Sequence, residues 1–204
     1  MKVWFLLLLA VVCSPAYAMV EGKVEPQVGV VSLDYQWFRV GSDTGRSYNY
    51  FLEYGLDEGT GIVLCYNRLC SGSDRVSLGG AYAKVELHES RRGLSHSAVY
   101  GGFQSRHLTS PGAGVNLTGF QFGLVTDGSI TGGIRGLGRI GADIYEDDTF
   151  LELELGTGIR LSSFAELQGG YRSIVSLRAQ GANTVDGLFV GLSVPLGRRP
   201  PLHW

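Results

Sequence analysis

A period-two alternation of apolar and polar residues runs through almost the whole chain after residue 28. Val31, Leu33, Tyr35 and Trp37 share one parity, and the residues between them are mainly polar. Because successive side chains of a β-strand point to opposite faces of a sheet, this pattern predicts strands with one apolar and one polar face. No long segment has the period of an amphipathic helix, and glycine is abundant, with 31 residues. The fold class is therefore all-β.

Short runs of glycine, aspartate, serine and asparagine separate the alternating segments, as turns between antiparallel strands require. One of these expected turns is Asp127-Gly128. We expect ten strands, with eight as the alternative because the pattern is less regular in the middle of the chain. The expected strands cover residues 28–40, 46–57, 60–69, 74–87, 96–107, 114–126, 129–145, 148–161, 164–178 and 185–196.

The start of the chain has the three parts of a secretory signal peptide. Lys2 supplies the positive charge, and residues 3–13 are all apolar. Ala16-Tyr17-Ala18 provides small residues for cleavage after Ala18. The apolar run is about half the length that a membrane-spanning helix needs. A lipoprotein signal modified at Cys13 is the alternative.

This leader sets the expected domain plan. Residues 1–18 form a cleaved signal peptide, 19–27 a short polar lead, 28–196 the β-barrel, and 197–204 a tail. Pro200 and Pro201 prevent that tail from continuing a strand.

The charged residues argue against a nucleic-acid partner. The chain has 17 Lys+Arg and 19 Asp+Glu, so losing Lys2 with the leader brings the net charge near −3. Nucleic-acid-binding domains usually carry a basic footprint instead. Only Lys23 and Lys84 are lysines after the leader; the other basic residues are arginines, whose planar guanidinium suits fixed, partly buried pairing with carboxylates.

The polar faces decide between a soluble and a membrane barrel. They are poor in lysine and rich in glycine, with single charged residues, which suits a narrow lumen filled by ion pairs, whereas the apolar face would meet lipid. The prediction is a closed, antiparallel, up-and-down transmembrane β-barrel, and the alternative is a soluble periplasmic lipocalin-like barrel with its apolar face inside. The expected lumen residues are Asp34, Glu53, Arg106, Arg135, Arg139, Glu152, Glu154, Glu166 and Arg172.

Aromatic residues fall near the same end of the first three expected strands. Trp37, Tyr48, Tyr50 and Tyr66 are expected to form part of an aromatic girdle at a membrane interface. Closing the sheet removes its edges, which lipid would not tolerate.

Cys65 and Cys70 are the two cysteines that follow the leader. Because export places them in an oxidising compartment, we expect a disulfide that pins a hairpin loop. No second His or Cys pair accompanies them, so no metal site is expected.

Residues 155–160, a Ser-Ser turn and residues 165–172 resemble the penultimate hairpin of small outer-membrane barrels of the OmpA/OmpX type. Residues 186–196 are similar to the closing strand of that family, although such chains usually stop at an aromatic residue and here eight residues follow Leu196. The resemblance covers 150–196. It implies the outer membrane of a Gram-negative bacterium, with its lipids and the barrel-insertion machinery as partners.

A structural or surface-interaction barrel with a filled lumen is the expected function, and a narrow porin-like solute channel is an alternative. A lipid-modifying hydrolase would need a serine with a nearby histidine. The only cluster of that kind comprises His88-Glu89 and Ser95-His96-Ser97, in which neighbouring residues point to opposite faces of a strand. We therefore expect no catalytic site, no enzyme activity and no cofactor.

Overall fold

The computed structural model describes residues 23–40, 43–72, 74–89, 95–111, 113–146, 148–162, 165–177 and 184–196. The expected leader 1–18, the first part of the polar lead (19–22) and the tail 197–204 lie outside the described residues. Within those ranges, no helix has the length and hydrophobicity needed to cross a membrane.

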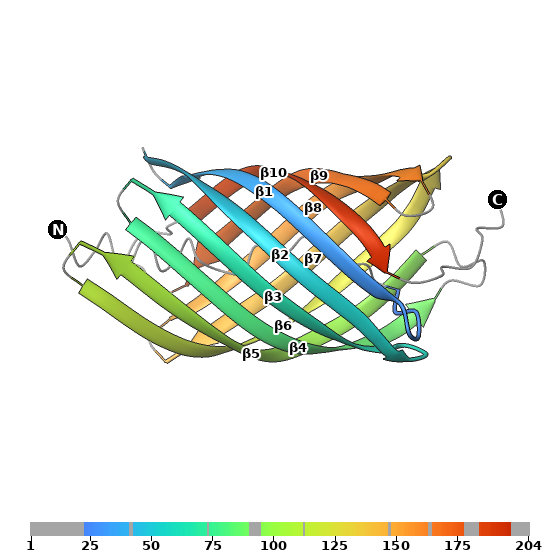
Figure 1. Cartoon of the computed structure of the whole chain (residues 1–204), viewed down its shortest axis with the longest axis horizontal. Coiled ribbons are helices and arrows are strands. Elements are labelled where there is room, and N and C mark those ends of the chain that lie inside the picture. Colours follow the sequence, from blue (N-terminus) through green and yellow to red (C-terminus); the bar gives the residue numbers. More distant parts are fainter. Residues whose placement is uncertain are drawn as a thin grey trace.

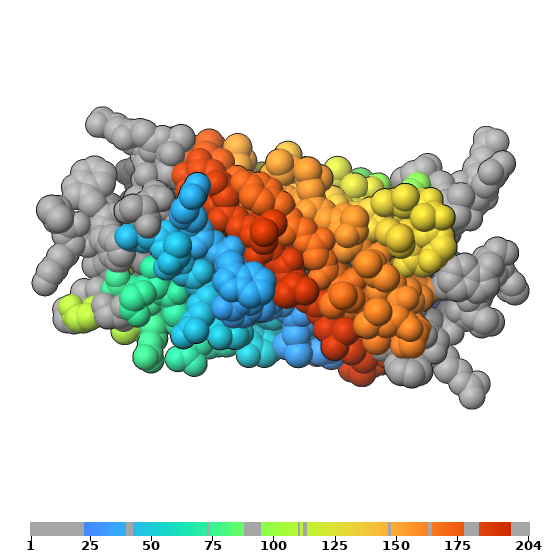
Figure 2. Space-filling view, turned by 90° about the horizontal axis from the view of Figure 1, so that it is seen from above, coloured from blue at the N-terminus to red at the C-terminus, as the bar shows by residue number. Residues whose placement is uncertain are grey.

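Ten antiparallel strands close into one barrel, which confirms the expected architecture and the higher of the two strand numbers (Figure 1). Each strand pairs with the next one along the chain, and β1 pairs with β10 to close the sheet. In Figure 2 these two strands, blue and red, lie side by side on the outer wall. The strands are β1 (Gly29–Val40), β2 (Asp43–Asp57), β3 (Thr60–Ser71), β4 (Asp74–Glu89), β5 (Ser95–Ser110), β6 (Ala113–Thr131), β7 (Ile134–Tyr145), β8 (Thr149–Ser162), β9 (Ala165–Ser176) and β10 (Thr184–Leu196).

The barrel has two different ends. At the terminal rim, β1 begins and β10 ends; at the far rim, β1 ends and β2 begins. Four register shifts interrupt the strand pairing, all of them where even-numbered strands reach the terminal rim. Bulges of this kind are common at barrel rims, where they bend a strand as it leaves the sheet.

The turn between β6 and β7 lies five residues beyond the expected one. Asp127-Gly128 stays inside β6, and the chain reverses at Gly132 and Gly133, whose φ angles are +40° and +86°. Tight two-residue hairpin turns need positive φ, which glycine adopts without steric cost. The diglycine therefore makes the turn, and Asp127 becomes a buried lumen residue.

The apolar face of the sheet points outward. Large apolar side chains such as Leu33, Leu153, Phe103 and Leu188 are exposed on the outer wall, whereas the polar residues that alternate with them are buried. This is the reverse of a soluble lipocalin-like barrel, in which the apolar face would line the interior. An outer wall of this kind is stable only when lipid covers it.

Candidate functional site

The lumen contains a belt of buried, hydrogen-bonded charges centred on Arg172 of β9. Its Nε donates to Glu154 Oε2 at 2.6 Å, and its Nη1 donates to Gln36 Oε1 at 3.0 Å. Its Nη2 lies 3.5 Å from Asp34 Oδ2, and Asn49 donates to the same carboxylate. This part of the belt therefore joins β9 to β8, β1 and β2, crossing the position of β10.

Arg139 of β7 continues the belt on the other side of Glu154. Its guanidinium pairs with Glu152, and its Nη1 lies 3.8 Å from the Glu154 Oε2 that also accepts from Arg172. Its Nε donates to Tyr100 Oη at 2.7 Å. Gln121 of β6 donates to Glu152 at 3.4 Å. The belt therefore runs around the lumen from β2 through β1, β9, β8, β7 and β6 to β5.

A second group of charges surrounds Arg135, nearer the terminal rim. Its Nη2 and Nε donate to the two Glu166 oxygens at 2.6 and 3.1 Å, and its Nη1 donates to Asp127 Oδ2 at 3.3 Å. Gln168 donates to Glu166 at 3.1 Å. Two carboxylates and a forked guanidinium on facing strands make the bidentate geometry for which arginine is suited.

Lys84 and His96 form a third group at the terminal rim. Lys84 Nζ donates to Glu53 Oε1 at 2.6 Å and to the Lys23 carbonyl at 3.3 Å. His96 Nδ1 lies 3.0 Å from Glu86 Oε1, while Glu86 Oε2 accepts from a backbone amide of the polar lead. Hydrogen bonds from residues 23 and 24 thus attach that lead to the barrel wall.

The guanidinium of Arg106 lies over two aromatic rings. Its guanidinium carbon lies 4.3 Å from the centre of the Tyr145 ring and 5.2 Å from that of Phe150. A cation over an aromatic face is stabilised by the ring quadrupole.

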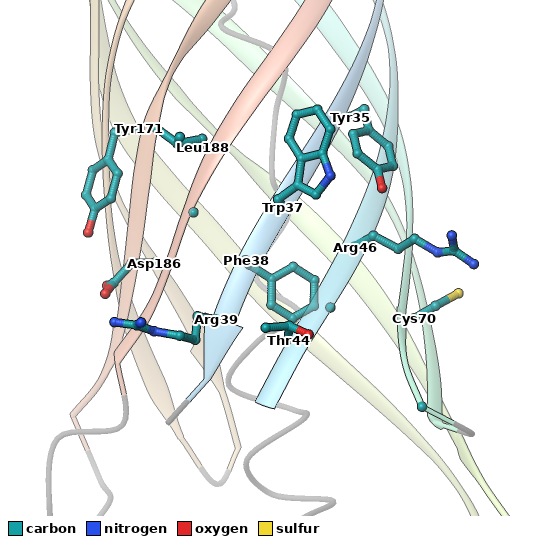
Figure 3. Close-up of a pocket in the computed structure, with 13 residues that line it drawn as sticks. Tyr35, Trp37, Phe38, Arg39, Thr44, Arg46, Cys70, Tyr171, Asp186 and Leu188 are labelled. Carbon is teal, nitrogen blue, oxygen red and sulfur yellow. The ribbon is translucent and has the colours of Figure 1, made fainter. Parts of the chain in front are cut away.

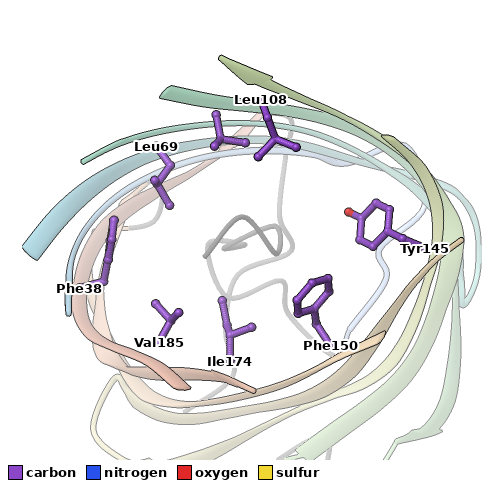
Figure 4. Packing of buried hydrophobic residues seen from close by; sticks show 8 residues of the cluster. Phe38, Leu69, Leu108, Tyr145, Phe150, Ile174 and Val185 are labelled. Carbon is purple, nitrogen blue, oxygen red and sulfur yellow. The ribbon is translucent and has the colours of Figure 1, made fainter. Parts of the chain in front are cut away.

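Those two rings belong to an apolar collar that lines the lumen at the far rim (Figure 4). In Figure 4 the labelled side chains point inward from all round the barrel. The collar comprises Phe38, Leu69, Val76, Leu108, Tyr145, Phe150, Ile174 and Val185. The lumen therefore combines its charged groups with an apolar collar at the far rim and a second apolar cluster on the inner faces of β2–β6.

The nine expected lumen residues all lie on the inner face; eight of them are buried and Arg135 is partly exposed. The ion pairs described above join eight of these residues to other lumen side chains: Asp34, Glu53, Arg135, Arg139, Glu152, Glu154, Glu166 and Arg172. Sequence reasoning missed Lys84, Glu86, His96, Asp127 and the collar. Lys84 and Glu86 have the parity of the inner face of β4, and this parity was the signal that could have found them.

The four expected girdle residues lie on the outer wall of β1, β2 and β3. Tyr35 joins them, with its ring centre 4.4 Å from that of Trp37 and 5.1 Å from that of Tyr48. The rings of Tyr50 and Tyr66 are 6.2 Å apart.

The expected Cys65–Cys70 disulfide is absent, and both cysteines are thiols. They lie on one strand, β3, rather than in a hairpin loop, and Cys70 is five positions after Cys65. At about 3.3 Å per residue their Cα atoms are roughly 16 Å apart, far beyond the reach of a disulfide. Cys65 also faces the lumen, whereas Cys70 has the parity of the outer wall.

The expected serine–histidine cluster does not bring Ser97 and His96 together on one face of β5. Ser97 has the outward parity and donates to Thr126 Oγ1 at 3.1 Å, whereas His96 is buried in the lumen. Among the described residues, no three His, Cys, Asp or Glu side chains are grouped so that they could hold a metal ion.

Several solved structures share this kind of barrel at low similarity. The N-terminal β-barrel domain of OprF from Pseudomonas aeruginosa is 10% identical, with a TM-score of 0.39, and the match covers 82% of this chain and 98% of that one. Neisserial surface protein A is 11% identical, with a TM-score of 0.41 and coverages of 82% and 95%. The translocator domain of the autotransporter NalP from Neisseria meningitidis is 13% identical, with a TM-score of 0.45 and 95% coverage of both chains. Similarities this low have no bearing on function.

No curated protein matches the sequence. The model of one protein family does match, over residues 4–195, and its description is outer membrane protein beta-barrel domain. That range includes nine strands of the closed barrel completely and β10 except for its last residue, Leu196. The chain therefore belongs to the outer membrane protein beta-barrel domain family.

Proposed function

We propose that this chain is a structural or surface-interaction barrel of the outer membrane whose lumen is filled by side chains and conducts no ions. The belt of ion pairs carries this proposal. Asp34, Arg172, Glu154 and Arg139 each expose 5% of their surface or less. Charges this deeply buried are stable only when they are paired, so the belt resists being parted by a passing solute.

The collar supports the same proposal at the far rim. A ring of apolar side chains offers no hydrogen bonds to a hydrated ion, and hydrophobic constrictions block conduction by excluding water. A solute would have to cross both the belt and the collar, which lie in series along the lumen.

Conductance across a planar lipid bilayer tests this function directly. The wild-type barrel is expected to give no stepwise current, whereas the double variant Arg139→Ala/Phe150→Ala, which loses one member of each barrier, is expected to give steps. The matched control, Leu155→Ala/Phe103→Ala, alters the outer wall alone and should stay silent. Steady unitary steps from the wild-type chain would establish the narrow channel instead.

We further propose that the barrel has no enzyme activity. The separation of Ser97 and His96 onto opposite faces of β5 supports this view, because a nucleophile and its base must be within hydrogen-bond reach. Incubating the folded barrel with phospholipid and lipid A, and following release of acyl chains by mass spectrometry, tests it. Release that Ser97→Ala abolishes would show a hydrolase.

We also propose that residues 1–18 direct export and are removed after Ala18, and that the barrel-insertion machinery reads residues 186–196. The order of the leader segments supports the first step. The mass of the chain recovered from outer membranes should correspond to a start at Met19. A lipid-modified chain starting at Cys13 would indicate the lipoprotein signal.

A further inference from the structure

Three arginines on neighbouring strands surround Cys70 on the outer wall near the far rim. In the sheet register, Arg46 of β2 lies opposite Cys70, and Arg75 of β4 lies opposite it on the other side. Arg68 precedes Cys70 by two residues on β3 and shares its face. All three arginines are exposed. Directly opposed side chains are about 5 Å apart at Cβ, so Arg46 and Arg75 lie on either side of Cys70 and roughly 10 Å from each other.

The three arginines contrast with those of the lumen. Arg135, Arg139 and Arg172 pair with carboxylates. No ion pair joins Arg46, Arg68 or Arg75 to a carboxylate in the described part of the chain. Like charges held together on a sheet repel each other, and this repulsion is strongest where lipid keeps water away. An anion from outside the chain would relieve it.

The wall at these arginines is hollowed. A hollow of about 570 Å³ is lined by Arg46, Tyr48, Tyr50, Tyr66, Arg68 and Cys70. It therefore has guanidinium groups toward the far rim and aromatic rings toward the middle of the barrel. No carboxylate lines the hollow, which is therefore cationic toward the far rim and aromatic toward the middle of the barrel.

A second hollow, of about 910 Å³, adjoins the first and shares Arg46 and Cys70 with it (Figure 3). Trp37, Tyr35 and Tyr171 line its aromatic part, and Figure 3 shows Arg46 pointing away from the strand beside Cys70. Asp186 also lines this hollow, together with Arg39. The anion is therefore expected in the first hollow, and the second offers further aromatic surface for acyl chains.

We propose that the far rim lies at the outer leaflet of the membrane, and that the first hollow, together with Arg75 beside it on β4, binds a phosphorylated glycolipid of the lipid A type there. Arginine forks bind phosphate oxygens bidentately, and aromatic rings at the depth of a membrane interface contact the start of acyl chains. Three cations spread over three strands, which are about 4.8 Å apart, span roughly 10 Å, more than a single phosphate requires. The two phosphates of lipid A match this width better than the single phosphate of a glycerophospholipid.

Native mass spectrometry of the folded barrel in detergent, titrated with defined lipids, tests the site. Lipid A is expected to stay bound, while dephosphorylated lipid A and phosphatidylglycerol bind at least about tenfold more weakly, as the loss of charge-assisted hydrogen bonds predicts. Arg46→Gln/Arg68→Gln should remove the preference. Arg46→Lys/Arg68→Lys keeps the charge but loses the forks, and should retain part of it.

A matched control neutralises two exposed charges at the opposite rim. Asp57→Asn/Glu58→Gln leaves both hollows intact and should bind lipid A like the wild type. Equal binding of lipid A and its dephosphorylated form would overturn the proposal, as would a Gln/Gln variant that binds normally. Equal binding of phosphatidylglycerol would make the surface a general site for anionic lipids and would overturn the glycolipid assignment. None of these outcomes depends on whether the lumen conducts.

Discussion

Arg172 on β9 and Arg139 on β7 share one carboxylate oxygen, Oε2 of Glu154 on the intervening strand β8. The Arg172 Nε lies 2.6 Å from that oxygen and the Arg139 Nη1 3.8 Å from it. Both guanidinium groups therefore depend on a single side chain for part of their charge compensation, and Glu154 links the Arg172 and Arg139 parts of the lumen belt.

Replacing Glu154 with glutamine should strongly destabilise the barrel. The substitution keeps the shape but leaves two buried cations short of a negative charge, and breaking buried pairs costs about 3–5 kcal/mol. The temperature at which the compact, unboiled gel band disappears should fall clearly. Leu155→Ala is the matched control, because the adjacent side chain faces lipid. Similar losses in both variants would mean that the belt contributes little.

Phe150→Ala should destabilise the barrel far more than Phe103→Ala. Phe150 is 2% exposed in the collar and packs against Tyr145, whereas Phe103 is 71% exposed on the outer wall. Truncating a buried phenylalanine costs about 3–5 kcal/mol. Urea unfolding in detergent micelles, followed by tyrosine and tryptophan fluorescence, would compare the two free energies. Equal effects would contradict the tight packing of the collar.

Cys70 should react with a small maleimide much faster than Cys65 in the folded barrel. Cys65 is buried in the lumen, whereas Cys70 is half-buried at the outer wall. After boiling in denaturant both thiols should react, with or without reductant, because no disulfide protects them. Mass spectrometry counts the added groups. A chain that takes up label only after reduction would carry the disulfide after all.

Gly102→Ala should be poorly tolerated, whereas Gly79→Ala should be close to neutral. A Cβ at Gly102 would lie 2.1 Å from the backbone oxygen of Ala81, while the nearest atom to one at Gly79 is 4.0 Å away. Forcing the strands apart costs about 1–3 kcal/mol, as other overpacked sites do. The same unboiled gel assay measures the difference. A normal melting temperature for Gly102→Ala would show that β4 and β5 can shift without loss.

Strict parity explains why the sequence predicted so much of the lumen. Glu152 and Glu154 alternate with leucines along β8, so a single decision about which face meets lipid places both carboxylates inside. The same parity places Arg172 and Glu166 inside on β9. The partners within the lumen could not be predicted in this way, because they depend on the register and tilt of strands that are distant in sequence.

The polarity of a residue is misleading where an apolar side chain faces inward. Phe38 follows Trp37 and looks like a continuation of the apolar wall, yet it shares the parity of Asp34 and points into the collar. Cys65 and Cys70 were misjudged for a related reason, since they were expected to bridge a hairpin loop although both lie on the one extended strand β3. In both cases local composition suggested the wrong environment, and only the closed sheet reveals the correct one.

The belt crosses the line along which the two ends of the chain meet. Asp34 belongs to the first strand and Arg172 to the ninth, and these strands approach each other only after β1 has paired with β10. Ser32 and Ser193 also join the first and last strands directly, at 3.0 Å. While the sheet is open, Asp34 and Arg172 lie near opposite edges, and Arg172 has only Glu154 of the neighbouring strand as its carboxylate partner among these contacts. Completion of the cylinder thus brings the Asp34 carboxylate to the Arg172 guanidinium, so that an open sheet differs electrically from a closed barrel.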